Sequence, residues 1–213
     1  MNDGYDSSDS AGRWNGRYEE GKTGWDLGGA PPVLLRAIPR FTTRPGADDR
    51  TAPLRVLVPG CGRGHDAVAW ARAGAVTTGI DFAPLAIEAA RAVAESEGVA
   101  VNYVQADVFS LPPTLRGAFD LVWEQTCFCA IPREMRRAYA ASMTAALVPG
   151  GVLLGLFWNH GREGGPPFDV ALEHVREAFD GLMVVDEVSE VHDSVEARTP
   201  EFLATLRCVG TTD

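Results

Sequence analysis

Short apolar runs alternate with helical segments from residue 54 to residue 209, and this alternation restricts the fold more than any other feature of the sequence. The runs that predict strands cover residues 54–58, 75–80, 101–105, 119–123, 151–158, 183–191 and 202–209. Helical spacing covers residues 66–73, 84–97, 132–147 and 168–179. Strands separated by single helices form right-handed βαβ units, in which successive strands run parallel.

The last two predicted strands, 183–191 and 202–209, depart from this pattern. The loop between them is too short for a crossover helix, so one of the two is expected to run antiparallel. The fold class is therefore α/β, with a Rossmann-like, seven-stranded, mostly parallel sheet that carries helices on both faces. Sheets of this kind bind ligands in the crevice at the carboxyl ends of their strands.

The domain organisation is simple, because 213 residues suit a single hydrophobic core. Residues 1–12 are polar and acidic without apolar periodicity, which predicts a disordered tail. Residues 13–213 are predicted to form one domain, and segment 13–41, with a short helix at 31–38, is its N-terminal cap. Residues 42–53 have the composition of a surface connection.

The formal net charge of -10 disfavours nucleic acid and anionic membrane surfaces as partners, because both require clustered Lys and Arg. No apolar run approaches the roughly 18 residues that span a bilayer. Cys61, Cys127, Cys129 and Cys208 form neither a CxxC pair nor a metal-ligand spacing, so we expect reduced thiols and no metal. These features predict a cytoplasmic protein, either a monomer or a homodimer.

A glycine-rich turn follows the first predicted strand of the sheet and contains Gly60, Gly62 and Gly64. Glycines at this turn allow a tight bend and let a ligand approach the backbone closely. The dinucleotide-binding pattern G-x-G-x-x-G would need a third glycine where this chain has His65. The turn therefore favours a ligand without a pyrophosphate and makes a nicotinamide enzyme a distant alternative.

Two acidic residues end the next two predicted strands. Asp81 is placed to accept hydrogen bonds from both hydroxyls of a ribose, although it is also placed to cap the helix that opens at Pro84. Asp107 is placed to accept from the amino group of an adenine, although a loop-capping role fits it as well. Together with the glycine turn, these residues line one crevice and predict a nucleoside-containing ligand.

This combination resembles the class I S-adenosylmethionine-dependent methyltransferases over essentially residues 14 to 209, and it is most similar to the thiopurine methyltransferase superfamily. Within that superfamily, the closest resemblance is to the thiol, halide and thiocyanate methyltransferases. The motifs that carry it are Trp14, Tyr18, residues 23–26, residues 57–62 with His65 and Asp66, residues 128–131 and residues 164–168.

The resemblance implies S-adenosylmethionine as cofactor and S-adenosylhomocysteine as product. The residues that it implies for cofactor binding are Trp14, Tyr18, Trp25, Gly60, Cys61, Gly62, Asp81, Phe82, Asp107, Val108, Glu124 and Gln125. The family often has Trp in place of Tyr18, and Asp-Tyr or Asp-Arg in place of Glu124 and Gln125. The identity of the methyl acceptor is the least certain inference from the resemblance.

The candidates for the acceptor pocket are Glu124, Gln125, Trp158, His160 and Arg198. His160 is a candidate base and Arg198 a candidate attractor of anions, although a solvated loop histidine and a structural ion pair fit them too. The chain lacks the Asn/Asp-Pro-Pro-aromatic signature of nucleic-acid amino methyltransferases, which favours a soft nucleophile. A thiol is already partly ionised at neutral pH and halide or thiocyanate fully so, which makes a dedicated base optional.

Three functions are consistent with this sequence. The favoured one is methyl transfer to a small soft acceptor, namely a thiol, sulfide, halide or thiocyanate. The second is O- or N-methylation of a small molecule or natural-product intermediate, which requires a base within reach of the pocket. The third is a non-catalytic cofactor-binding module, which the intact glycine turn and acidic strand ends disfavour.

Overall fold

The computed structural model describes residues 7–42 and 52–209. Its seven strands form one sheet in the order β3-β2-β1-β4-β5-β7-β6. The strands are β1 (Arg55–Pro59), β2 (Val76–Asp81), β3 (Asn102–Gln105), β4 (Phe119–Gln125), β5 (Leu147–Trp158), β6 (Met183–Val191) and β7 (Glu201–Cys208). β7 pairs antiparallel with both β5 and β6, and the other pairs are parallel, which confirms the predicted mixed sheet.

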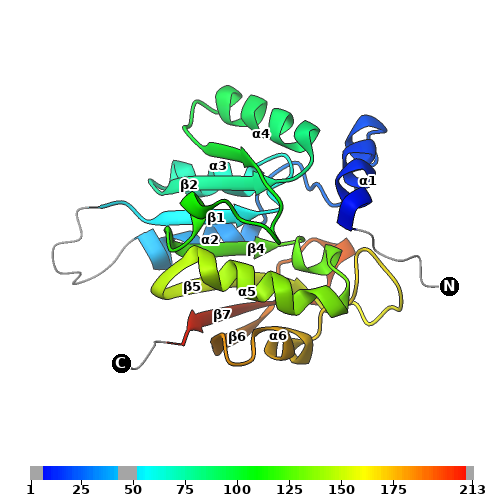
Figure 1. Ribbon diagram of the computed structural model, residues 1–213, viewed down its shortest axis with the longest axis vertical. Coiled ribbons are helices and arrows are strands. Elements are labelled where there is room, and N and C mark those ends of the chain that lie inside the picture. The colour runs from blue at the N-terminus through cyan, green and yellow to red at the C-terminus, as the bar shows by residue number, and fades with distance from the viewer. Residues whose placement is uncertain (1–6, 43–51, 210–213) are drawn as a thin grey trace.

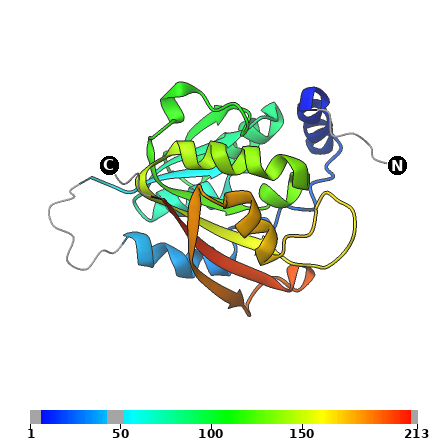
Figure 2. The same cartoon turned by 60° about the horizontal axis from the view of Figure 1, so that its bottom comes forward.

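Helices cover both faces of the twisted sheet (Figures 1 and 2). The helices are α1 (Ser7–Glu19), α2 (Pro32–Thr42), α3 (His65–Arg72), α4 (Pro84–Ser96), α5 (Arg136–Ala146) and α6 (Leu172–Phe179), with short 3-10 turns η1 (Pro113–Leu115), η2 (Phe128–Ala130), η3 (Arg133–Met135) and η4 (Glu196–Arg198). None of the helices in the described part of the chain is long and apolar enough to cross a bilayer.

Two apolar layers hold the sheet between its helices. Strand β1 contributes to both layers, and its residues Val56, Leu57 and Val58 are all buried. Leu57 belongs to the layer that contains α5 and α6, whereas Val56 and Val58 belong to the layer that contains α2, α3 and α4. A strand that alternates between two covered faces is a continuous apolar run, as expected for the centre of a parallel sheet.

Most predicted elements begin and end within a few residues of the observed ones. The largest differences are at the end of α2, which is Thr42 rather than residue 38, and at the starts of α5 (Arg136 rather than 132), β5 (Leu147 rather than 151) and α6 (Leu172 rather than 168). β4 continues to Gln125, two residues beyond the predicted end at 123. The predicted connection at 42–53 lies mostly outside the described residues.

The prediction of a disordered tail at 1–12 is wrong for residues 7–12, because α1 begins at Ser7; residues 1–6 lie outside the described part. The reason is tertiary packing. The Asn15 side chain accepts a hydrogen bond of 3.1 Å from the Leu85 amide at the start of α4, and α1 packs against α4. A helix that is anchored in this way extends along the chain at little extra cost.

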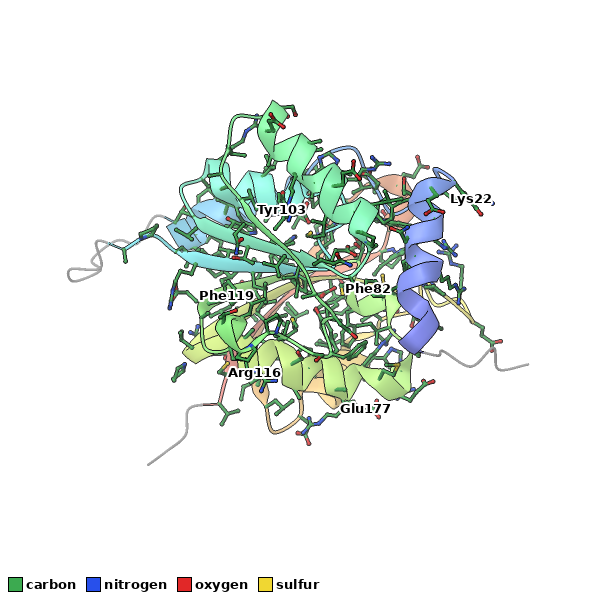
Figure 3. The ribbon with its side chains drawn as sticks, turned by 45° about the horizontal axis from the view of Figure 1, so that its top comes forward. Lys22, Phe82, Tyr103, Arg116, Phe119 and Glu177 are labelled. Atoms are coloured by element: carbon green, nitrogen blue, oxygen red, sulfur yellow. The ribbon has the colours of Figure 1, made fainter. Side chains whose placement is uncertain are left out.

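The carboxyl ends of the parallel strands gather several distant segments at one edge of the sheet. Figure 1 shows α1, the yellow loop after β5 and the orange turn before β7 at this edge. Figure 3 shows Phe82, which follows β2, facing α1, whereas Phe119 at the start of β4 lies on the opposite side.

Candidate active site

A cavity of about 470 Å³ lies at this edge. The turns after β1, β2, β3 and β4 contribute to its wall, as do the cap, the loop after β5 and the turn η4. Its lining residues are Trp14, Arg17, Tyr18, Gly24, Trp25, Leu27, Gly60, Asp81, Phe82, Asp107, Val108, Phe109, Thr126, Cys127, Cys129, Ala130, Ile131, Trp158, Arg162, Pro166, Pro167, Val195, Ala197 and Arg198. A smaller pocket of about 60 Å³ lies beside it. Residues of the glycine turn, such as Cys61 and Gly62, line this pocket together with Asp66 of α3 and Gln125 at the end of β4.

The glycine turn has a backbone that other residues would strain. Gly60 and Gly62 have φ of 55° and 53°, in the left-handed region that glycine occupies at no steric cost. A Cβ on Gly60 would lie 2.9 Å from the Cys127 sulfur, and one on Gly62 would lie 3.2 Å from the Tyr18 hydroxyl. Glycine at these two positions therefore lets Cys127 and Tyr18 pack directly against the backbone of the turn.

Asp81 is held by the backbone at the end of β2. Its carboxylate accepts hydrogen bonds from the Gly62 amide at 3.0 Å and from the Ala83 amide at 2.9 Å. Burial raises the pKa of Asp81 to about 6, against the opposing effect of these amides. The residue lines the cavity and fixes the glycine turn, and each of its oxygens keeps a lone pair for a further donor.

The turns after β2 and β3 complete this side of the cavity. Phe82, Asp107 and Val108 all line it. Asp107 accepts a hydrogen bond of 2.9 Å from the Phe109 amide, so the loop-capping role is present, and no side chain or amide of the described residues donates to its other oxygen. The apolar Phe82 and the acidic Asp107, at successive strand ends, are suited to the apolar ring and the polar edge of a nucleoside.

Three aromatic rings of the cap form the opposite wall. Trp25 packs edge-on against Trp14 and Tyr18, with ring centres 5.0 and 5.6 Å apart. The Arg17 guanidinium lies 5.3 Å from the Trp14 ring centre. Burial and the neighbouring Asp81 carboxylate raise the pKa of Tyr18. The rings exclude water and present electron-rich faces, an environment that favours a cationic sulfonium.

The carbonyl of Trp25 and the side chain of Asp26 connect the cap to the rest of the protein. The Trp25 carbonyl accepts a short hydrogen bond from Arg198 Nη2, and Asp26 pairs with Arg63 Nε at 2.8 Å. Asp26 also lies 3.4 Å from His65 Nε2. The cap therefore contacts the glycine turn and the turn before β7 at the same point.

These features fit S-adenosylmethionine, the cofactor that the resemblance implies. The backbone of the glycine turn, which lines the smaller pocket, suits its methionyl part, the Asp81 carboxylate suits ribose hydroxyls, and Asp107 with Val108 suits an adenine edge. The described residues include no group of three or more His, Cys, Asp or Glu side chains that would hold a metal ion.

Glu124 does not line the large cavity, but it lines a small pocket of about 10 Å³ beside it, together with Cys129, Trp158 and Arg198. Its carboxylate accepts a hydrogen bond of 2.7 Å from the Phe128 amide and a short one from the Tyr139 hydroxyl of α5. Burial raises the pKa of Glu124 to about 7. The cause is strand alternation, because Glu124 lies within β4 and its side chain enters the layer beneath α5.

Gln125 lies on the other face of β4 and lines the smaller pocket. With its amide nitrogen directed at Asp66, it donates to that carboxylate at 2.5 Å and accepts from Arg198 Nη1 at 3.3 Å. Asp66 also accepts a hydrogen bond of 2.7 Å from the Trp123 indole. Gln125 thus connects Arg198 to the helix after the glycine turn rather than entering the large cavity.

The three remaining acceptor candidates differ in whether they line the large cavity. Trp158 and Arg198 line it, whereas His160 does not. The His160 ring packs against Trp158 with centres 4.7 Å apart, and its Nδ1 accepts a hydrogen bond of 3.1 Å from the Arg162 amide. His160 therefore supports the loop after β5, and its role as a base stays a prediction.

Sequence reasoning missed Arg17, Thr126 and Arg162, which all line the cavity. Thr126 has φ of 64°, which is unusual for a β-branched residue and sharply redirects the chain after β4. No pattern in the sequence marks that turn. Arg17 and Arg162 belong to a helix and a loop whose positions depend on tertiary contacts.

Comparisons with known proteins identify the family of this chain. The family profile described as Thiopurine S-methyltransferase (TPMT) matches residues 9–209. Thiocyanate methyltransferase 1 of Brassica oleracea is 38% identical over 167 residues, which cover 76% of this chain and 68% of that protein. Probable thiol methyltransferase 2 of Arabidopsis thaliana is 31% identical over 188 residues, which cover 84% and 79%.

A solved structure supports the fold. The Burkholderia thailandensis 1,6-didemethyltoxoflavin-N1-methyltransferase, determined with S-adenosylhomocysteine, has a TM-score of 0.71 at 18% identity and covers 93% of this chain and 87% of its own. The class I methyltransferase fold and S-adenosylmethionine as cofactor are thus established. The chain belongs to the thiopurine S-methyltransferase family, and it is an S-adenosylmethionine-dependent methyltransferase of small molecules.

Proposed function

We propose that this enzyme methylates the sulfur of a small soft nucleophile, a thiolate, sulfide or thiocyanate, and that halide is accepted in the same position. The observation that carries the proposal is the absence of a carboxylate or imidazole from the acceptor half of the cavity lining. That half comprises Cys127, Cys129, Ala130, Ile131, Trp158, Arg162, Pro166, Pro167, Val195, Ala197 and Arg198. The two lining carboxylates, Asp81 and Asp107, belong to the cofactor half.

The cysteines of the acceptor half are poor bases. Burial raises the pKa of Cys127 well above its usual range and that of Cys129 to about 12, so both remain protonated at neutral pH. Cys129 further donates to the Thr126 carbonyl at 3.3 Å. An acceptor bound beside them therefore needs to arrive ionised, as a thiolate, halide or thiocyanate does.

When bound, the cofactor supplies an electrophilic methyl carbon on a sulfonium. The task of the protein is to hold the nucleophile in line at about 3–3.5 Å in a dry site, which is worth roughly 7–11 kcal/mol. Trp14, Tyr18 and Trp25 would exclude water from one side, and Trp158 with Pro166 would limit the acceptor on the other. Arg198 adds a positive charge that attracts anions.

The names of the relatives support sulfur as the accepting atom, because thiocyanate, thiol and thiopurine methyltransferases all match this chain. We further propose that residues 13–213 act as one domain, as a monomer or a homodimer in the cytoplasm, with neither nucleic acid nor membrane as a partner. The net charge of -10 and the four free cysteines support these assignments.

The test is a screen of thiols, thiocyanate, iodide, phenols and amines, with S-adenosylhomocysteine release as the readout. With S-adenosylmethionine held at saturation, thiol turnover should rise with pH through the pKa of the acceptor thiol, while iodide turnover should stay constant over the same range. Turnover of phenols or amines but of no sulfur acceptor would contradict the proposal. A pKa near 6.5 shared by thiol and iodide would contradict the base-free mechanism.

A further inference from the structure

Three arginines line the cavity from three separate parts of the chain, namely Arg17 of α1, Arg162 of the loop after β5 and Arg198 of η4. None of the three has a carboxylate as an ion-pair partner among the described residues. Elsewhere, seven arginines pair with carboxylates, namely Arg36, Arg40, Arg55, Arg63, Arg72, Arg133 and Arg207. Six other arginines of the described part, Arg13, Arg91, Arg116, Arg136, Arg137 and Arg176, also lack a carboxylate partner, so the three are distinguished by their place on the cavity wall.

The cofactor accounts for only part of this charge. S-adenosylmethionine carries one carboxylate, on its methionyl part, next to an ammonium group. Arg198 lines both the large cavity and the pocket of the glycine turn, and Arg17 lies against Trp14 and Trp25 of the cap. These two arginines therefore border the methionyl end.

Arg162 has a different position. It lines the large cavity but not the pocket of the glycine turn, and its guanidinium lies 4.9 Å from the centre of the Trp158 ring. Its own amide is fixed on His160, and the preceding Gly161 amide donates to Asp169 at 2.7 Å, so the loop that carries it is braced. Arg162 presents a positive charge at the acceptor end, where the cofactor brings no anion.

We infer that Arg162 is a specificity-determining residue that binds a second anionic group of the acceptor, away from the reacting sulfur. The class of acceptor is a small thiol that bears a carboxylate. Pro166, Pro167 and Ile131 would pack against its apolar part, and the guanidinium would pair with its carboxylate in a charge-assisted hydrogen bond. This inference rests on the proposed function, since it concerns the same acceptor site.

The experiment compares two acceptors that share one shape but differ in charge, para-mercaptobenzoate and para-mercaptobenzamide. For the unmodified enzyme, we expect kcat/KM to be about fivefold higher for the benzoate, mainly through KM, because an exposed charge pair adds up to about that much. In Arg162→Gln, the ratio of kcat/KM for the benzoate to that for the benzamide should fall to within about twofold. The matched control is Arg116→Gln, an exposed arginine on the far side of the sheet from Phe82 (Figure 3), which should keep the preference.

A purely structural role for Arg162 on Trp158 would lower turnover of both acceptors equally, and that result would overturn the inference. So would an unmodified enzyme that does not distinguish benzoate from benzamide. Calorimetric titration of both compounds into the complex with S-adenosylhomocysteine provides a readout independent of turnover. If no sulfur acceptor is methylated, the proposed function fails, while a loss of benzoate binding in Arg162→Gln would still support an anion site at this residue.

Discussion

The two halves of the cavity are built in different ways. The cofactor half comes from three successive strand ends between Gly60 and Val108, and its acidic groups are held by backbone amides of neighbouring turns. The acceptor half is assembled from the turn after β4, the loop after β5 and the turn before β7. Behind it, Trp158 Nε1, His160 Nε2 and Arg136 Nη1 are buried without a hydrogen-bond partner among the described residues. Local geometry fixes the first half, whereas tertiary packing fixes the second.

The largest effect is expected at the floor of the cofactor half. Gly60→Ala combines a left-handed backbone with a Cβ only 2.9 Å from the Cys127 sulfur. We expect it to weaken S-adenosylhomocysteine binding by about 2–4 kcal/mol, from backbone strain and overpacking together. Calorimetric titration measures this loss.

Gly74→Ala is the matched control, because Gly74 has φ of 87° but open space around its Cβ position. It should cost about 1–2 kcal/mol of folding stability and leave cofactor binding unchanged. A double variant with Cys127→Ala should recover part of the binding lost in Gly60→Ala. Equal binding in Gly60→Ala and Gly74→Ala would show that the floor does not contact the cofactor.

A somewhat smaller effect is expected at Asp81. Asp81→Asn should weaken cofactor binding by about 1–3 kcal/mol, because one acceptor is replaced by a donor that faces the ribose hydroxyls. Burial raises the pKa of Asp81 to about 6, so binding by the unmodified enzyme should weaken as the pH falls through that value. In the variant, this dependence should disappear, and titrations between pH 5 and 8 at about unit intervals test it.

The raised pKa of Asp81 affects folding stability in the opposite direction, because the free energy of unfolding decreases as the pH rises. The folded protein retains the Asp81 proton up to about pH 6, whereas an unfolded aspartate releases it near about pH 3.9. The contribution of Asp81 to the free energy of unfolding therefore falls as the pH rises between these two values. A pH dependence of binding that persists in Asp81→Asn would assign the effect to another group, such as the buried Asp66, whose pKa burial also raises to about 6.

The cap links the two halves, and breaking its fastening to Arg198 should have an intermediate effect. Arg198→Ala removes the donor to the Trp25 carbonyl. Trypsin should then cleave the cap at Arg13, Arg17 or Lys22 about fivefold faster, because the segment opens more often. In the unmodified enzyme, S-adenosylhomocysteine should slow the same cleavage.

The control for this experiment is Arg207→Ala. It removes an exposed ion pair between Arg207 of β7 and Asp186 of β6 and should leave cleavage of the cap unchanged. Cleavage that is the same in Arg198→Ala and in the unmodified protein would mean that ring packing alone holds the cap. Cleavage that S-adenosylhomocysteine does not slow would mean that the cap does not close over the cofactor.

The smallest effect is expected at His160. Since this residue does not line the cavity, His160→Gln should change kcat/KM for thiols by less than about threefold. The pH dependence of thiol turnover should keep following the pKa of the acceptor. A loss of about a hundredfold, together with a new pH profile, would restore His160 as a general base.

The contrast between the halves also explains what sequence reasoning could predict. The glycine turn, Asp81 and Asp107 are strand-end features that require only the order of strands and helices, so their meeting at one crevice was predictable. Glu124 is a candidate in the sequence because the family resemblance implies it, whereas within β4, which continues to Gln125, alternation turns its side chain toward α5.

The acceptor half offered no comparable pattern. Arg162 is one of several arginines in the sequence, and its value as a candidate arises only because its loop folds back over Trp158. Thr126 gives no sign in the sequence of its left-handed backbone. Both depend on contacts between segments that local preferences do not specify.

The position of β7 between β5 and β6 has a consequence for the order in which the molecule folds. β6 pairs only with β7 in the described sheet, and the hydrogen bond from Arg198 to the Trp25 carbonyl spans 173 residues. The contact between Arg198 and Trp25 joins segments that are distant in the chain, and contacts of this kind form late and slowly, because a long loop must close before they contribute. During synthesis, the glycine turn and Asp81 emerge early, but the substrate-facing surface is completed only when the last strand has paired. A nascent or truncated chain without β7 would carry much of the cofactor crevice and would have no complete place for an acceptor.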